Sequence, residues 1–231
     1  LNYAMVLKAV LFDLDNTLVD FMRMKEACSE AAIYAMIEAG LPMKEGAANK
    51  KLFEMYEKVG IENQKIFESF LKKTMGKVDF KILAAGVAAY RRVKSGNLVP
   101  YPHVRGTLVK LKERGLSLGI VSDAPRMQAW LRLAEMNLTE FFDVVVALED
   151  TGRLKPSKMP FKQAVKKIGI RPEEILFVGD NPERDIKGAK SVGMFTALAA
   201  YGQRIKGKAK ADFVLKEVRD LLKIIDSYKE L

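Results

Sequence analysis

A short apolar segment near the start of the chain is followed at once by two acids. Residues 9–12 read AVLF, and Asp13 and Asp15 come directly after them. Apolar and polar residues do not alternate in this segment, which is typical of a strand buried on both faces of a parallel sheet. Residues i and i+2 of an extended chain point to the same side. We therefore expect both carboxylates to face one site, where their repulsion requires a cation, a shared proton or separate acid and base roles.

Strands and helices alternate in the second half of the chain. The apolar segments 118–121, 142–146, 175–178 and 194–199 have the composition of buried strands, and 213–214 that of a short last one. Segments with helical spacing lie near 104–114, 126–137, 160–169, 183–192 and 216–229. This alternation predicts an α/β fold, with a Rossmann-like, doubly wound parallel sheet.

The segment between residues 21 and 98 has a different character. Apolar residues recur there at three- and four-residue steps, and no strand pattern is visible. The predicted helices lie near 21–39, 47–59, 62–75 and 79–95. The sequence therefore predicts two domains, a core made of residues 1–20 and 99–231 and an inserted α-helical domain of residues 21–98.

The composition limits the kinds of molecule that the protein is expected to bind and the compartment in which it is expected to occur. The net charge is +10 and the pI is about 9.5, but the lysines are scattered among glutamates and no nucleic-acid-binding motif is present. The single cysteine, Cys28, excludes an intrachain disulfide and favours a reducing compartment. No apolar run is long enough to span a membrane, and no signal-peptide pattern is visible. We expect a cytoplasmic protein, monomeric or dimeric, that binds neither nucleic acid nor membrane.

Polar residues follow several of the predicted strands. Ser122 follows the second strand, Lys155 and Pro156 come after the third, and Asp180 follows the fourth, with Asp185 five residues later. The carboxyl ends of parallel strands lie at one edge of the sheet, so these side chains are expected to converge with Asp13 and Asp15. Carboxylates suit Mg²⁺, while a lysine and a hydroxyl group bind phosphate oxygens. The sequence therefore predicts a site for Mg²⁺ and a phosphate group.

Four motifs in this order resemble those of the haloacid dehalogenase-like hydrolase superfamily. They are Asp13-x-Asp15-x-Thr17, Ser122, Lys155-Pro156, and Gly179-Asp180 with Asp185. The helical insert is similar to the C1 cap of that superfamily. The chain departs from the pattern at Asp123, where many relatives have asparagine or glycine.

The resemblance implies a role for each site residue. Asp13 would be the nucleophile that becomes an aspartyl phosphate, and Asp15 the general acid and then the base. Ser122 and Lys155 would bind the transferring phosphoryl group, and Asn16 and Thr17 would shape the loop around it. The expected Mg²⁺ ligands are the Asp13 side chain, the Asp15 main-chain carbonyl group, Asp180 and, directly or through water, Asp185.

Alternative reactions remain at this stage. A 2-haloacid dehalogenase needs neither a proton donor at position 15 nor a metal-binding acid at position 180, and this chain has both Asp15 and Asp180. A phosphomutase shares the first half-reaction. A phospho-acceptor signalling module also groups aspartates and a lysine at strand ends, but it lacks a helical insert. The favoured substrate is a small phosphorylated metabolite, such as a triose phosphate, another short sugar phosphate or phosphoglycolate.

Overall fold

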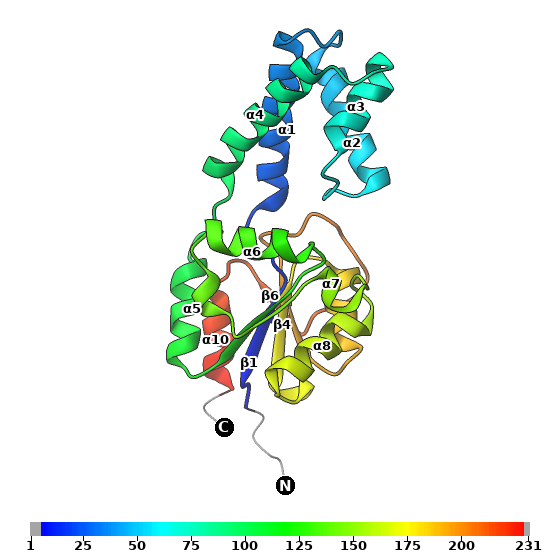
Figure 1. Cartoon of the computed structure of the whole chain (residues 1–231). Coiled ribbons are helices and arrows are strands. Elements are labelled where there is room, and N and C mark those ends of the chain that lie inside the picture. Colours follow the sequence, from blue (N-terminus) through cyan, green and yellow to red (C-terminus); the bar gives the residue numbers. More distant parts are fainter. Residues whose placement is uncertain (1–5, 229–231) are drawn as a thin grey trace. The chain divides into compact units, whose positions relative to one another are not determined.

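The computed structural model describes residues 6–228. The chain forms two compact units (Figure 1). One unit is the insert Phe21–Leu98, and the other is the core formed by the rest of the chain. The ends of the predicted core, residues 1–5 and 229–231, lie outside the described residues. No helix within residues 6–228 is long and apolar enough to cross a membrane.

A parallel sheet forms the centre of the core. Within the described residues it has six strands in the order β3-β2-β1-β4-β5-β6. Their bounds are Ala9–Phe12 for β1, Ser117–Val121 for β2, Val144–Val146 for β3, Ile175–Gly179 for β4, Phe195–Ala199 for β5 and Phe213–Leu215 for β6. Every residue of β1 and β4 is buried, as expected for strands covered on both faces. The strand order reverses between β1 and β4, the place where open α/β sheets bind ligands.

Helices cover both faces of this sheet. Figure 1 shows α5 and α10 on one side and α7 and α8 on the other. On the α8 side, the ring of Phe161 packs edge-on against that of Phe177 in β4, with 5.1 Å between centroids. The core helices are α5 (Val104–Glu113), α6 (Arg126–Glu135), α7 (Leu148–Thr151), α8 (Lys158–Ile168), α9 (Lys187–Lys190) and α10 (Asp220–Ser227).

The insert is a helical unit with its own apolar core. It consists of α1 (Phe21–Glu38), α2 (Glu45–Val59), α3 (Ile66–Met75) and α4 (Phe80–Asn97). The largest of its fully buried side chains include Ile33, Met36, Leu52, Phe70 and Leu71. Because Gly86 has no side chain, α4 can lie close to α1. A Cβ atom at that position would lie 2.2 Å from the Met36 Cε atom.

The two points where the chain leaves and re-enters the core are joined by hydrogen bonds of the core itself. Val19 pairs with Pro100 in an antiparallel bridge, and the Tyr101 N–H donates to the Leu18 carbonyl group at 2.9 Å. The Tyr101 ring packs against that of Tyr201, 5.1 Å between centroids. We call Leu18–Asp20 together with Val99–Tyr101 the neck.

The predicted fold class, an α/β sheet with an inserted set of helices, is confirmed. Element ends differ at several places. The predicted helix 183–192 is instead a wide π-helical turn, Pro182–Ile186, followed by the short α9. The short helix α7 was not predicted. The third strand begins at Val144 rather than residue 142, and the last helix spans Asp220–Ser227 rather than 216–229, of which residue 229 lies outside the described residues.

Candidate active site

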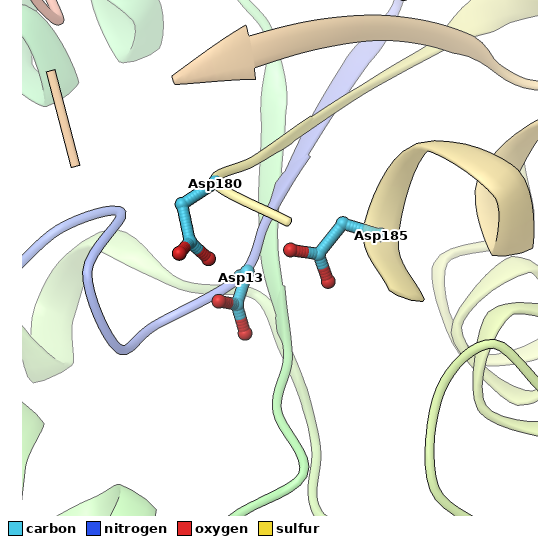
Figure 2. A group of neighbouring side chains, drawn as sticks. All are labelled: Asp13, Asp180 and Asp185. Atoms are coloured by element: carbon cyan, nitrogen blue, oxygen red, sulfur yellow. The ribbon is translucent and has the colours of Figure 1, made fainter. Parts of the chain in front are cut away.

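Three buried carboxyl groups meet where the order of the strands reverses. Asp13 follows β1 and Asp180 follows the neighbouring β4, while Asp185 lies on the turn Pro182–Ile186. One carboxylate oxygen from each lies within 4.8 Å of the other two, and the three side chains lie together in Figure 2. None of the three residues is more than 6% exposed. The predicted convergence of these side chains is thus present in the structure.

The turn that carries Asp185 is fixed by its own hydrogen bonds. The Asn181 side chain accepts from the N–H groups of Glu183 and Arg184 and caps the turn. The Asp185 Oδ2 atom accepts from the Asn181 N–H at 3.0 Å. Gly179 makes room for this carboxylate, because a Cβ atom there would lie 2.5 Å from the Cβ atom of Asp185.

A buried lysine joins two of the carboxylates. The Lys155 Nζ atom lies 2.5 Å from Asp13 Oδ1 and 2.8 Å from Asp185 Oδ1, and it donates to the Val121 carbonyl group at 3.0 Å. Its side chain has no exposed area. Burial by itself would lower the pKa of Lys155, but the charges of Asp13 and Asp185 raise it above its ordinary value. The lysine is therefore a permanent cation inside the site.

One lysine does not neutralise three carboxylates. Burial, with the nearby charges of Asp13 and Asp185, raises the pKa of Asp180 to about 8. Burial also raises the pKa of Asp13, although Lys155 opposes this effect. The site thus has an excess of negative charge, relieved either by a proton or by a cation. Oxygen ligands from three acids are the donor set that a hard divalent cation such as Mg²⁺ takes, so the residues fit that ion.

Asp15 lies outside the three-carboxylate cluster and has a separate partner. Its Oδ2 atom accepts a hydrogen bond of 2.7 Å from the Arg132 guanidinium group, on α6. The Arg132 side chain is only 4% exposed, whereas that of Asp15 is 20% exposed. The two acids that follow β1 therefore have different surroundings, Asp13 beside a lysine and two acids and Asp15 beside an arginine.

Asn16 and Thr17 shape the loop that follows these acids. Asn16 adopts a left-handed backbone conformation, with φ of 59°, and its N–H donates to the Val19 carbonyl group at 2.7 Å. The Thr17 hydroxyl group lies 3.5 Å from Asp13 Oδ2, and its carbonyl group accepts from the Tyr201 hydroxyl group at 2.8 Å. These contacts place both residues in the framework of the loop.

Ser122 and Asp123 follow β2 at the same edge of the sheet. The Ser122 hydroxyl group is buried and accepts from the Ala124 N–H at 3.1 Å, so it also supports its own turn. Asp123, the departure from the expected motif, accepts from the main-chain N–H of Lys155 at 2.9 Å. Its other oxygen lies 3.5 Å from the Arg184 guanidinium group. Asp123 thus fixes the backbone of the segment that carries the lysine.

Comparison with known protein families assigns this fold and site to a family. The model of the haloacid dehalogenase-like hydrolases matches residues 10–199, which include all the residues of the site. The chain belongs to the haloacid dehalogenase-like hydrolase family. The predicted resemblance is confirmed.

Relatives of the chain include phosphatases. The chain is 34% identical to a glyceraldehyde 3-phosphate phosphatase of Methanocaldococcus jannaschii, over 97% of this chain and all of the relative. It is 32% identical to a pyrophosphatase of Halalkalibacterium halodurans, over 96% of this chain and 98% of that one. A magnesium-bound structure of the hydrolase YfnB from Bacillus subtilis shares the fold, with a TM-score of 0.70, 21% identity and coverage of 96% and 99%. The prediction of a phosphatase of the haloacid dehalogenase-like family is confirmed.

Two arginines of the site were not predicted. Arg132 belongs to an amphipathic helix and contacts a residue 117 positions earlier in the chain. The available signal was its place on the stripe that also holds the buried Ala129 and Leu133, where a charged side chain needs a partner. Arg184 precedes Asp185 directly, and the carboxylates around it raise its pKa although burial opposes this.

Proposed function

We propose that this protein is a Mg²⁺-dependent phosphatase of small phosphorylated metabolites, with glyceraldehyde 3-phosphate as the first candidate substrate. The observation that carries the proposal is the buried cluster of Asp13, Asp180 and Asp185 around Lys155. The candidate substrate comes from the relatives, of which the one from M. jannaschii aligns over its whole length.

In this proposal Asp13 is the nucleophile. A carboxylate oxygen of Asp13 attacks phosphorus, a new O–P bond forms, and the bond from phosphorus to the ester oxygen breaks. Lys155 already contacts Asp13 at 2.5 Å, so it lies within reach of phosphoryl oxygens held at that carboxylate. Ser122 is the second expected donor to those oxygens. Asn16 and Thr17 keep the loop around the phosphate in place.

Asp15 carries the protons. It donates a proton to the departing alkoxide and then takes one from the water that hydrolyses the aspartyl phosphate. Its partial exposure suits this role, since a residue that exchanges protons with substrate and water must be accessible to both. Two acids separated by one residue thus perform different steps because their neighbours differ.

The metal ligands in this proposal are the side chains of Asp13, Asp180 and Asp185 and the main-chain carbonyl group of Asp15. When bound, Mg²⁺ supplies positive charge that lets an anionic carboxylate approach a phosphate dianion. The raised pKa of Asp180 is the sign in this structure that the carboxylates need such a charge.

Pyrophosphate is a second candidate substrate. The relative from H. halodurans, a pyrophosphatase, is nearly as similar to the chain and aligns over 98% of its length. Both candidates contain the phosphoryl group that the carboxylate and lysine cluster would receive, and they differ only in the group that leaves.

The test is phosphate release by the purified protein with Mg²⁺ from glyceraldehyde 3-phosphate, pyrophosphate, phosphoglycolate and p-nitrophenyl phosphate. We expect activity that EDTA abolishes and Mg²⁺ restores, and that Asp13→Asn eliminates. Asp143→Asn is a matched control, because Asp143 lies at the amino end of β3, whereas the site lies at the carboxyl ends of the strands. Metal-independent halide release from 2-haloacids, without phosphate release, would refute the proposal.

A further inference from the structure

We propose that Arg132 is a positioning residue that sets the carboxyl group of Asp15 for proton transfer. This inference rests on the proposed function, in which Asp15 is the general acid and base. The observation is the hydrogen bond of 2.7 Å between a nearly fully buried guanidinium group and Asp15 Oδ2.

The buried position of Arg132 indicates that its guanidinium group is held by specific contacts, of which the one to Asp15 is the shortest described. Removing a guanidinium group from water costs free energy unless ionic and hydrogen-bonding partners replace the water. The other arginine near the start of the same helix, Arg126, remains 53% exposed and pairs with Asp150. One helix thus has an arginine at the surface and another directed to the loop of Asp15, and only the second contacts a residue of the site.

Proton transfer depends strongly on where the carboxyl group lies. A general acid must come within about 3 Å of the oxygen that it protonates, and a small misplacement of a reacting group costs a large factor in rate. Asp15 lies just beyond the end of β1, in an isolated bridge with Val19 that fixes its main chain and not its side chain. The planar fork of arginine fixes the orientation of a carboxylate more firmly than a lysine does. The structure thus assigns the orientation of Asp15 to Arg132.

Substrates with different leaving groups distinguish a positioning role of Arg132 from a merely structural one. An aliphatic alkoxide needs a proton as it leaves, whereas p-nitrophenolate is stable without one. Loss of Arg132 should therefore slow formation of the aspartyl phosphate from the aliphatic ester that the wild type hydrolyses fastest, and hardly affect its formation from p-nitrophenyl phosphate. Single-turnover measurements isolate this step from the later hydrolysis of the aspartyl phosphate, in which Asp15 is the base for both esters. We expect Arg132→Gln to lower the single-turnover rate for the aliphatic ester by about 10- to 100-fold, a part of the ~10²–10⁴ that general acid–base catalysis contributes. Its KM should change little.

Four further variants make the experiment specific. Arg132→Lys should retain an intermediate kcat, because it keeps the charge without the fork. Asp15→Asn combined with Arg132→Gln should be no slower than Asp15→Asn alone, since the arginine acts through that carboxylate. Arg126→Gln, on the same helix, should behave like the wild type. Added guanidinium ion at concentrations that do not unfold the protein should partly restore Arg132→Ala.

Each result supports or overturns the inference. An equal loss in the rate of aspartyl phosphate formation from both esters in Arg132→Gln and Arg132→Lys, or additive losses in the double variant, would overturn the positioning role while leaving the phosphatase proposal intact. A wild-type protein that releases phosphate from none of the substrates would overturn both. A selective loss on the aliphatic ester, absent in Arg126→Gln and in the Asp15→Asn background, would establish the role.

Discussion

Replacement of Lys155 by methionine tests the electrostatic description of the site most directly. The lysine is the cation that contacts both Asp13 and Asp185, and it has no exposed side-chain area. Methionine has a similar length and removes only the charge and the hydrogen bonds. In Lys155→Met the two carboxylates lose their common cation while they stay buried.

The expected cost follows from these contacts. Breaking a buried ion pair by removing one partner costs ~3–5 kcal/mol. The lower end applies here, because the carboxylates can take up protons, as the raised pKa values of Asp13 and Asp180 show. A loss of about 3 kcal/mol corresponds to a decrease of ~6–12 °C in Tm for a domain of this size. Mg²⁺ should offset much of this loss, since it supplies the missing positive charge.

Thermal unfolding at pH 7, with EDTA and with Mg²⁺, measures both effects. The matched control is Lys167→Met, which removes a lysine that also pairs with an aspartate, Asp150 at 2.8 Å, but whose side chain is 36% exposed. That pair is expected to contribute at most ~1 kcal/mol. An equal Tm for Lys155→Met and the wild type in EDTA would refute the reasoning, as would a variant that Mg²⁺ stabilises less than the wild type.

Three other changes probe the carboxylates of the site. The pKa of Asp180, raised to about 8, means that the metal-free folded protein holds a proton that the unfolded chain loses near pH 4. Its stability should thus fall as the pH rises from about 4 to 8 and level off above 8, and Mg²⁺ affinity, measured by calorimetry, should rise up to ~10-fold per pH unit between pH 6 and 8. Affinity independent of pH, or unchanged pH dependence in Asp180→Asn, would contradict this. Gly179→Ala should cost ~1–3 kcal/mol in urea unfolding and weaken Mg²⁺ binding, since the new Cβ atom meets Asp185; an unchanged midpoint would show that the turn can move. Asp15→Asn should accumulate a phosphoenzyme visible by mass spectrometry, which Asp13→Asn cannot form. A phosphoenzyme in Asp13→Asn would identify another nucleophile.

The meeting of Asp13, Lys155, Asp180 and Asp185 was predictable because a simple rule governs it. Buried parallel strands are visible as apolar runs, and their carboxyl ends share one edge of the sheet. Asp13 and Asp180 come directly after such runs and must therefore approach one another, while Lys155 and Asp185 lie in the segments that follow the third and fourth strands. The structure also places Asn16 and Thr17 in the loop between Asp15 and the neck.

The partner of Asp15 was not predictable by the same rule. Arg132 lies on a helix, and a helical arginine usually faces water. Which residue of the loop it meets depends on how α6 packs in the core, a tertiary property that the sequence spacing does not contain. The wide turn Pro182–Ile186 was misassigned for a related reason. Its spacing fits a helix, but the side chains of Asn181 and Asp185 close it by accepting hydrogen bonds from main-chain N–H groups.

The neck has a consequence for the way the chain can fold. Val19 and Pro100 pair inside the core, so the core holds the two ends of the insert together by its own hydrogen bonds. The segment Phe21–Leu98 is therefore a loop of the core whose two ends are held together. For a flexible loop, doubling the length raises the entropic cost of closing it by only ~0.6 kcal/mol. The pairing that closes the neck thus uses only residues of the core. We therefore expect that the insert can be shortened, lengthened or replaced between residues 20 and 99 without a change in the sheet.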